Sequence, residues 1–542
     1  MTATTDRADD AGVMRRVARR CVPAAIVVAL ALLASPAGSL ADGSGTLIHT
    51  DKGWVLGSTT SSGMRTFFGI PFARPPTGDL RFHAPEPPEP WGFRLAWSDL
   101  SPCPQLGIVT DENCLGLDVY APPAAESRHL PVMVWFCGGG YVFGWSSMYD
   151  PAPLVATGKV IVVTVNYRVG PFGFLALPGL ESESPTGQAT GDYGLMDQQA
   201  GLRWVQRNIA AFGGDPHNVT IFGESAGGNS VCAQVASPLA AGLFGHAISE
   251  SGFCGASPTL EVDSEQALIA SSEAFAARVG CPDVATMVSC LRALPASKLE
   301  SDSSASSGLT AAGVWEPDVD GYVLPRSLQD AWSSGQFNRV PMIIGTNLNE
   351  ARLFVFLDEL PQLSALTPDQ YTSWVDQLFG AQAPAVLDEY PVSAYGAADL
   401  AEAQAFTDAG FACPASYEAE HSTAHGQPLW QYEFADVNPP FADLDPFMNM
   451  GDFHASELFY LFDLLGLPAP LRPPQQTLSA QMINAWTTFA ATGQPGPIGS
   501  TPWPAFTDAS PQTMVLTSLG SHVIDDFSTE HKCAFWQTIT GS

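Results

Sequence analysis

A serine that could act as a nucleophile stands at position 225, within the segment Gly-Glu-Ser-Ala-Gly of residues 223–227. Residues 219–222 are Val-Thr-Ile-Phe and predict a strand, and the small residues after the serine predict a helix. A tight strand-to-helix turn lifts its serine above the sheet in a strained backbone conformation, and side chains two positions away would collide. Both of those positions must then be glycine. The motif alone also fits an ordinary glycine-rich turn, so further parts of a catalytic site are needed.

Three consecutive glycines, residues 138–140, follow a second predicted strand at residues 132–136. Without side chains, such a backbone can approach a ligand closely and point several N–H groups at one oxygen. We expect an oxyanion hole built from the N–H groups of Gly139 and Gly140, joined by that of Ala226 after the nucleophile. A flexible turn at a strand end is the alternative.

A serine nucleophile needs a general base, and the base needs a carboxylate that orients it. In enzymes with this serine motif the chain order is serine, acid, histidine. The chain has ten histidines. His246 precedes a predicted strand and is expected to be structural, and His421 and His425 lie in a polar helical stretch. His454 and His531 remain as later candidates.

The acid is expected at Glu350, which ends the segment Gly-Thr-Asn-Leu-Asn-Glu after a predicted strand at residues 342–344. A carboxylate just beyond a strand end is where α/β folds place site residues. Asp358 and Glu359 are alternatives, on what looks like an exposed helix face.

The elements that must position these residues alternate between apolar strands and longer helices. Short runs rich in Val and Ile, without strict alternation, suit a sheet that is buried on both faces. Residues 197–211 have helical spacing between two such runs, which implies a mostly parallel, twisted sheet with right-handed crossovers and flanking helices. The α/β fold class follows, with residues 42–542 as a single domain that contains inserted helical cap segments. The predicted strands are residues 132–136, 160–165, 219–222, 342–344 and Leu429–Phe434.

The N-terminus has the order of a secretory signal. Residues 14–20 contain four arginines, residues 22–34 are apolar except for one proline, and Ser39 and Ala41 place small side chains before Asp42. We therefore expect residues 1–41 to be removed and the protein to be secreted. A retained anchor is the alternative, although the apolar run is too short for an ordinary membrane span.

The amino-acid composition limits the classes of ligand and partner that the protein can bind. The chain has 542 residues, with 23 basic and 55 acidic residues and a formal net charge of −32. This charge argues against nucleic acid and anionic membranes, and it favours neutral or cationic ligands. Of ten cysteines, only Cys21 lies in the leader, so an odd number remains and at least one thiol stays unpaired. No CxxC pair exists, which leaves a zinc site little support.

Several motifs together make the chain resemble the type-B carboxylesterase/lipase family of the α/β-hydrolase superfamily, the group that also contains the cholinesterases. The resemblance covers residues 53–536. The motifs are Phe-Gly-Ile-Pro-Phe-Ala at 68–73, Glu-Asn-Cys-Leu at 112–115, Val-Asn-Tyr-Arg at 165–168, Phe-Gly-Gly-Asp-Pro at 212–216 and the serine segment at 223–228.

The resemblance implies a catalytic triad of Ser225, Glu350 and His454, with Glu224 and Ser251 in support. It implies hydrolysis of a carboxylic ester through an acyl-enzyme, with no cofactor and no metal, on a small-molecule or lipid-like ester. A lipase or a hydrolase of bulky polyesters or natural-product esters is an alternative, and a catalytically silent cholinesterase-like binding module is another. No stable membrane insertion is expected, and the oligomeric state is not indicated.

The resemblance also implies disulfides between Cys103 and Cys114, Cys281 and Cys290, and Cys413 and Cys533. It leaves the pairing of three cysteines open: Cys137, Cys232 and Cys254. Cys137 stands before the glycine triplet, where bacterial members usually have His; the backbone donors survive this change, and activity should survive it too.

Aromatic and aliphatic residues next to these motifs could line a substrate cleft, and core packing is the alternative for each. They are Tyr141, Phe143, Phe253, Leu353, Phe354 and Phe356.

Overall fold

The computed structural model describes residues 45–105, 109, 111–124, 128–157, 159–184, 187, 191–255, 265–303 and 315–540. By internal contacts the chain divides into Met1–Gly45 and Thr46–Ser542, and every element described below belongs to the second unit. The leader predicted at residues 1–41 lies outside the described residues.

An eleven-stranded sheet forms the centre of the fold, and its middle strands are parallel. From β15 to β9 every neighbouring pair is parallel, whereas the pairs at both ends are antiparallel. All five strands predicted from the sequence lie in this parallel part, which confirms the α/β fold class. In sheet order the strands are β16 (His522–Ile524), β15 (Thr513–Leu516), β13 (Leu429–Phe434), β12 (Met342–Asn347), β11 (His246–Glu250), β10 (Gly214–Glu224), β7 (Leu130–Phe136), β9 (Ile161–Val165), β6 (Gly116–Ala121), β4 (Arg65–Pro71) and β3 (Ser58–Thr59).

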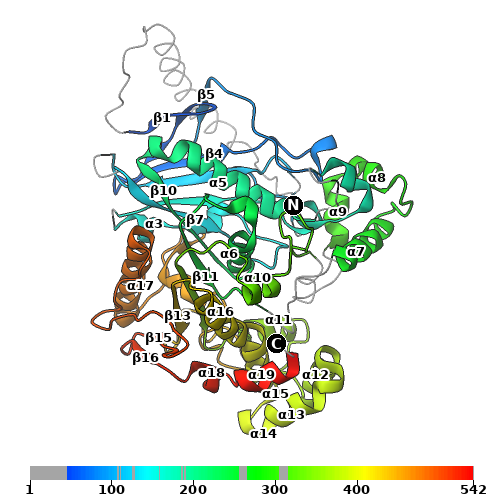
Figure 1. Ribbon diagram of the computed structural model, residues 1–542, viewed down its shortest axis with the longest axis vertical. Coiled ribbons are helices and arrows are strands. Elements are labelled where there is room, and N and C mark those ends of the chain that lie inside the picture. Colours follow the sequence, from blue (N-terminus) through cyan, green and yellow to red (C-terminus); the bar gives the residue numbers. More distant parts are fainter. Residues whose placement is uncertain are drawn as a thin grey trace, which may run out of the picture. The chain divides into compact units, whose positions relative to one another are not determined.

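Helices cover both faces of this sheet (Figure 1). On one face lie α5 (Tyr193–Phe212), α6 (Ala226–Ala236) and α16 (Cys413–Ala424), and on the other lie α3 (Ala152–Val155) and α17 (Pro473–Thr492). The helix predicted at 197–211 is α5. A sheet sandwiched in this way has no solvated face, which explains why its strands read as continuous apolar runs.

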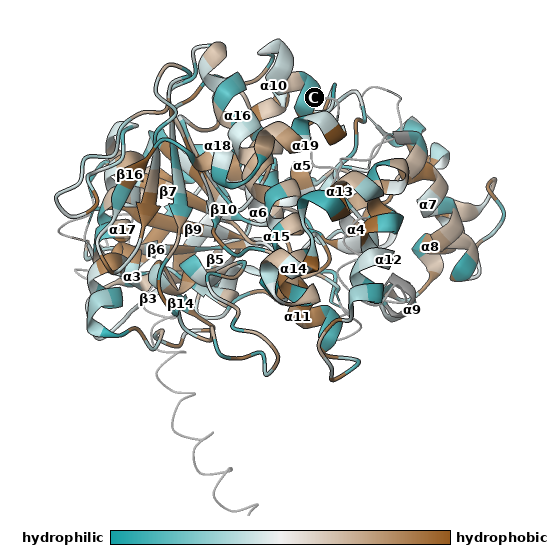
Figure 2. Ribbon diagram, turned by 90° about the horizontal axis from the view of Figure 1, so that it is seen from below, coloured by the Kyte–Doolittle hydropathy of each residue, from teal (hydrophilic) through white to brown (hydrophobic). Residues whose placement is uncertain are grey.

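The core sits on the central strands. All five residues of β9 are buried, and Trp135 of β7 packs its ring against Phe222 of β10 and Phe462. Figure 2 shows the hydrophobic colour concentrated on the strands around β7, with hydrophilic colour mainly on the surrounding helices and loops. This rigid layer fixes the strand ends from which the site residues project.

Inserted helical segments were predicted without a place in the chain, and the structure has them on both sides of β12. Those between β11 and β12 include α7 (Glu265–Arg278), α8 (Met287–Ala293), α9 (Ala296–Ser303) and α10 (Leu328–Ser334). Those between β12 and β13 are α11 (Arg352–Glu359), α12 (Pro368–Phe379), α13 (Ala383–Glu389), α14 (Val392–Tyr395), α15 (Ala398–Thr407) and a π-helix, η7 (Asp408–Ala412), which leads into α16. The second group builds its own apolar cluster around Tyr371, Val375 and Tyr390.

Four disulfides connect the described part of the chain. The three expected pairs are present, and Cys232 pairs with Cys254, which the sequence left open. Cys137 is unpaired and buried. The bridge from Cys413 to Cys533 joins η7 and α16 to α19 (Cys533–Thr540) across 120 residues, which the chain-entropy model values at about 5 kcal/mol.

Among the described residues, no helix has both the length and the apolar character that crossing a bilayer would require.

Candidate active site

Ser225 occupies a strained turn between β10 and α6. Its backbone has φ 58° and ψ −126°, and its N–H donates to the Glu250 carbonyl at 2.9 Å. A Cβ on Gly223 would lie 2.5 Å from the Gly227 carbonyl, and a Cβ on Gly227 would lie 2.1 Å from the Phe136 carbonyl oxygen. Both glycines are therefore required, for the steric reason that the sequence suggested. Backbone strain of this kind costs roughly 1–3 kcal/mol and persists only where the surrounding structure enforces it.

An acid and a base meet beside this turn although 104 residues separate them. Glu350 follows β12, and its Oε2 accepts a hydrogen bond from His454 Nδ1 at 2.6 Å. The other carboxylate oxygen, Oε1, accepts the Asn347 N–H at 2.8 Å, and the His454 N–H donates to the Glu350 carbonyl at 3.2 Å. Glu350 is completely buried and His454 nearly so. The arrangement fixes one imidazole tautomer, with Nδ1 protonated and Nε2 left as the acceptor.

The second imidazole nitrogen faces the turn. His454 Nε2 lies 3.1 Å from Oε1 of Glu224, the residue before the serine, but the two atoms do not form a hydrogen bond. Nε2 has no hydrogen-bond partner among the described residues, so a bond to the Ser225 hydroxyl is not made in this structure. Catalytic hydrogen bonds of this kind are often long or misaligned until substrate binds.

Buried carboxylates set the electrostatics of His454. Burial lowers the pKa of His454, but the neighbouring Glu224 and Glu350 carboxylates outweigh this and raise it above its usual value. Burial also raises the pKa of Glu224, to about 7, with His454 opposing the shift and Glu350 adding to it. The site thus holds several acidic groups around one imidazole, an environment suited to an imidazolium that forms during a reaction.

The glycine triplet lies directly against the serine turn. A Cβ on Gly138 would be 2.6 Å from the Glu224 carbonyl oxygen and 3.1 Å from the Ser225 Cβ. Gly139 and Gly140 have φ values of 116° and 58°, and neither N–H donates to an acceptor within the described part of the chain. These N–H groups are therefore available to a ligand. The Ala226 N–H stands in the first turn of α6, where N–H groups lack intrahelical partners.

Two phenylalanine rings enclose the imidazole. Phe354 of α11 and Phe411 of η7 have ring centroids 5.0 and 5.1 Å from that of His454, and the two rings stack on each other. Phe354 was among the predicted cleft residues, whereas Phe411 was not predicted. Its only sequence signal is its position two residues before Cys413, which marks the segment but not its place in space.

Polar support for the acid comes from Asn347 more clearly than from Ser251. The Asn347 side chain donates to the Phe453 carbonyl at 2.9 Å and to Glu457, while its backbone N–H holds Glu350. Ser251 adopts φ 49° and its N–H donates to the Gly345 carbonyl, but its buried hydroxyl has no hydrogen-bond partner among the described residues. The sequence singled out Ser251 and passed over Asn347.

The remaining predicted cleft residues differ in exposure. Tyr141 is buried, with its ring against Phe174, and Phe356 belongs to a buried apolar cluster. Phe253 is also buried, whereas Phe143 and Leu353 are half-buried. Of the six, only Phe354 has a ring contact with His454 among the described residues.

Cys137 directly precedes the glycine triplet and carries a buried thiol. Burial raises the pKa of the Cys137 thiol to about 12, so it stays protonated at neutral pH. The Tyr167 hydroxyl donates to the Cys137 carbonyl at 2.6 Å and so restrains the loop from behind. The loop is thus restrained although the histidine usual in bacterial members is replaced.

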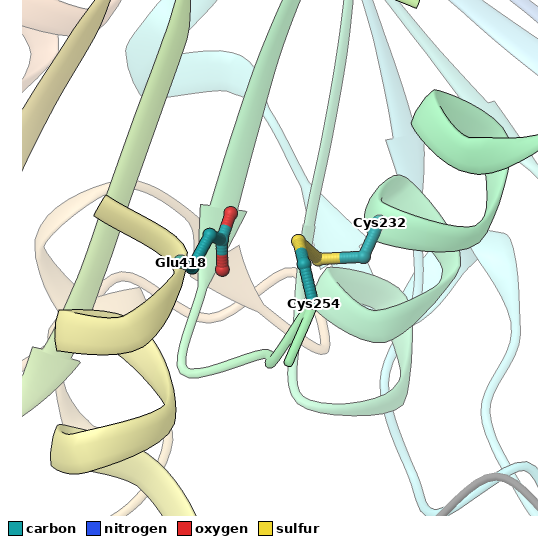
Figure 3. A group of neighbouring side chains, drawn as sticks. All are labelled: Cys232, Cys254 and Glu418. Atoms are coloured by element: carbon teal, nitrogen blue, oxygen red, sulfur yellow. A yellow bond between two sulfur atoms is a disulfide. The ribbon is translucent and has the colours of Figure 1, made fainter. Parts of the chain in front are cut away.

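One group of side chains among the described residues has the spacing of metal ligands: Cys232, Cys254 and Glu418 (Figure 3). The two sulfurs are bonded to each other, and a disulfide offers no thiolate. Burial raises the pKa of Glu418 well above its ordinary value, because it disfavours the charged carboxylate. With the disulfide intact, the two cysteines offer a cation no thiolate, and only the Glu418 carboxyl group is left of the three side chains.

The fold and the site define an α/β-hydrolase with a serine on a strand-to-helix turn. A family model described as the carboxylesterase family matches residues 44–536. The chain is 38% identical over 499 residues to the para-nitrobenzyl esterase of Bacillus subtilis, which covers 87% of this chain and 95% of that protein. It is 36% identical over 510 residues to a cocaine esterase of Oryctolagus cuniculus, covering 86% and 91%.

Solved structures agree with these relatives. A structure of PNB esterase superimposes with a TM-score of 0.77 at 34% identity and covers 91% of this chain and all of that one. The chain therefore belongs to the carboxylesterase family, and it is a carboxylic ester hydrolase.

The contact between Glu224 and His454 predicts a shift in pH dependence. Replacing Glu224 by Gln removes a carboxylate that raises the pKa of His454, so that pKa falls. If activity requires the neutral imidazole, the acid limb of the kcat/KM profile moves to lower pH. Profiles of wild type and Glu224→Gln on a non-ionising ester measure this. Glu418→Gln is the matched control, because Glu418 is buried elsewhere and should leave the limb unmoved; an equal shift in both variants would contradict the explanation.

Proposed function

We propose that Ser225 is the nucleophile of this ester hydrolase and that the reaction passes through an acyl-enzyme. His454 Nε2 accepts the proton of the Ser225 hydroxyl while Oγ attacks the ester carbonyl carbon. Glu350 accepts the N–H of Nδ1, holds the tautomer that leaves Nε2 free, and stabilises the imidazolium. The observation that carries this proposal is the 2.6 Å hydrogen bond between His454 Nδ1 and Glu350, formed beside the turn that presents Ser225.

The second half of the cycle uses the same imidazole. Protonated His454 gives its proton to the departing alkoxide oxygen as the C–O bond breaks, and the acyl group remains on Ser225. Nε2 then deprotonates a water molecule, which attacks the acyl carbon, releases the carboxylic acid and restores the serine. No metal or organic cofactor takes part in these steps.

Negative charge on the carbonyl oxygen would be held by the N–H groups of Gly139, Gly140 and Ala226. The two glycine N–H groups have no acceptor among the described residues, and each donor of this kind typically contributes about 3 kcal/mol to the transition state. A catalytically silent binding module fits less well, because it would have no use for a strained serine turn, a paired histidine and unused donors in one place.

The substrate is proposed to be an uncharged or cationic ester rather than an anionic one, because the chain carries a formal net charge of −32. Relatives named para-nitrobenzyl esterase and cocaine esterase support esters with an aromatic part. The Phe354 and Phe411 rings beside His454 would pack well against such a group.

We further propose that residues 1–41 are a cleaved leader and that residues 42–542 are secreted as a single domain. Four disulfides among the described residues support an oxidising destination.

The nucleophile is tested by Ser225→Ala. We expect kcat/KM on a short p-nitrophenyl ester to fall at least about a thousandfold, because the bond-forming oxygen is lost. Ser251→Ala is the comparison: it removes a buried hydroxyl from a neighbouring turn that also has positive φ, and it should cost less than about tenfold. Wild-type turnover in Ser225→Ala would refute the mechanism.

The leader is tested on protein recovered from the medium of an exporting host. N-terminal sequencing should begin at Asp42. A thiol titration of the denatured, unreduced protein should find one free thiol per chain, that of Cys137. A second thiol from Cys21, together with an N-terminus before residue 21 and retention in the cells, would show that the leader is kept.

A further inference from the structure

Six large apolar side chains are exposed on two segments next to the candidate site. Their exposed fractions run from 37% for Leu357 to 78% for Leu363. Isolated exposed leucines are ordinary, but a group of them close together marks a surface that binds something apolar. We name this group the apolar rim: Leu357, Leu360, Leu363, Phe441, Leu444 and Phe447.

The two segments of the apolar rim pack against each other. Arg352 of α11 donates from Nη1 to the Asn449 carbonyl at 2.8 Å. Val355 and Phe356 of α11 share one buried apolar cluster with Met448 and Met450 of the loop. Below the exposed leucines the two segments thus form one continuous piece of structure.

A buried carboxylate of α11, that of Glu359, lies close to Asp445 of the loop. The sequence suggested that Glu359 lies on an exposed helix face, but it is only 1% exposed. Burial, and then the Asp445 and Asp399 carboxylates, raise the pKa of Glu359 to about 7. Glu359 turns inward, where its Oε1 accepts the Leu366 N–H at 3.0 Å, and Leu357 and Leu360 remain exposed.

The apolar rim is attached directly to the residues proposed to act in catalysis. Helix α11 begins two residues after Glu350, and the loop at residues 435–453 ends one residue before His454. Phe354 of α11 also contacts the His454 ring. A substrate surface held by the apolar rim would therefore lie next to the candidate site.

The charged residues of the two segments indicate which kind of apolar surface the apolar rim can bind. Residues 357–366 and 437–450 contain no Lys or Arg, and their charged residues are all acidic: Asp358, Glu359, Asp443 and Asp445. Two arginines outside these ranges, Arg352 and Arg472, donate hydrogen bonds to carbonyl groups of the loop. Together with the net charge of −32, this disfavours anionic lipid surfaces. An uncharged ester above its solubility limit offers a continuous apolar surface without that penalty.

We propose that the apolar rim binds the surface of aggregated, uncharged ester substrate, and that it thereby lets the enzyme act on droplets as well as on dissolved ester. This inference rests on the proposed function of the adjacent site. The inference concerns the physical form of the substrate, dissolved or aggregated, which does not follow from the geometry of Ser225, Glu350 and His454.

The chain offers a matched control surface. Phe93 and Leu95 of β5 (Phe93–Leu95) are 45% and 49% exposed, close to the 52% and 57% of Phe441 and Leu444. Figure 1 shows β5 in the upper part of the view and α11 below the middle. The variants Phe441→Ser/Leu444→Ser and Phe93→Ser/Leu95→Ser therefore remove the same two side-chain types at similar exposure.

The experiment follows hydrolysis of tributyrin from below to above its solubility limit. We expect the wild-type rate to rise again when droplets form. On dissolved ester, the rate of the Phe441→Ser/Leu444→Ser variant should stay within about twofold of the wild-type rate. On droplets, its rate should be at least about fivefold lower than that of wild type. The Phe93→Ser/Leu95→Ser variant should match wild type on both forms of the substrate. Sedimentation with phosphatidylcholine-coated and phosphatidylglycerol-coated droplets should show weaker binding to the anionic ones.

Three outcomes would overturn the inference: no rise in the wild-type rate at the solubility limit, equal losses in both double variants, or a wild-type dimer that the Phe441→Ser/Leu444→Ser variant breaks. The last would mean that a second copy of the chain covers the apolar rim. Failure of the proposed function is distinct, because it would appear as activity on dissolved ester in Ser225→Ala.

Discussion

The close approach of three backbone segments at Ser225 is the constraint on which the rest of the site depends. The end of β7, the serine turn and the start of α6 meet so closely that a Cβ on Gly138, Gly223 or Gly227 would lie within 2.6 Å of a main-chain atom. Close packing of this kind holds Ser225 at a positive φ and places Gly138, the first residue of the glycine triplet, against the serine turn. The proposed nucleophile and the proposed oxyanion donors thus depend on one steric arrangement, supported by a sheet that is buried on both faces.

Burial also governs the chemistry of the acidic groups. Glu224, Glu350 and His454 share a volume from which water is largely excluded, so each carboxylate acts strongly on the imidazole. The same low polarity keeps the Cys137 thiol protonated and inert beside the glycine loop. The site combines an imidazole with a raised pKa, a carboxylate hydrogen-bonded to it and N–H groups without an acceptor among the described residues, which suits the proposed reaction.

The local sequence pattern was sufficient to predict features that depend only on residues close together in the chain. The serine turn, the glycine triplet and the five central strands could be read from spacing and residue type, because sterics and burial act within a few positions. Features that depend on distant segments could not be read in this way. The Cys232–Cys254 bridge, the Phe411 ring on His454 and the inward turn of Glu359 each require knowing which helix packs on which. His454 itself followed from a family resemblance, since its neighbours alone do not distinguish it from His531.

His454 Nε2 makes no hydrogen bond to the Ser225 hydroxyl in this structure, although the proposed mechanism requires one. A crystal structure of the protein inactivated by a fluorophosphonate ester would place a stable analogue of the tetrahedral intermediate in the site. We predict phosphorus bonded to Ser225 Oγ, a phosphoryl oxygen within hydrogen-bond distance of the N–H groups of Gly139, Gly140 and Ala226, and His454 Nε2 turned toward Oγ with its Nδ1 still on Glu350. Phosphorus on another residue, or His454 remaining out of reach of Oγ, would contradict the account.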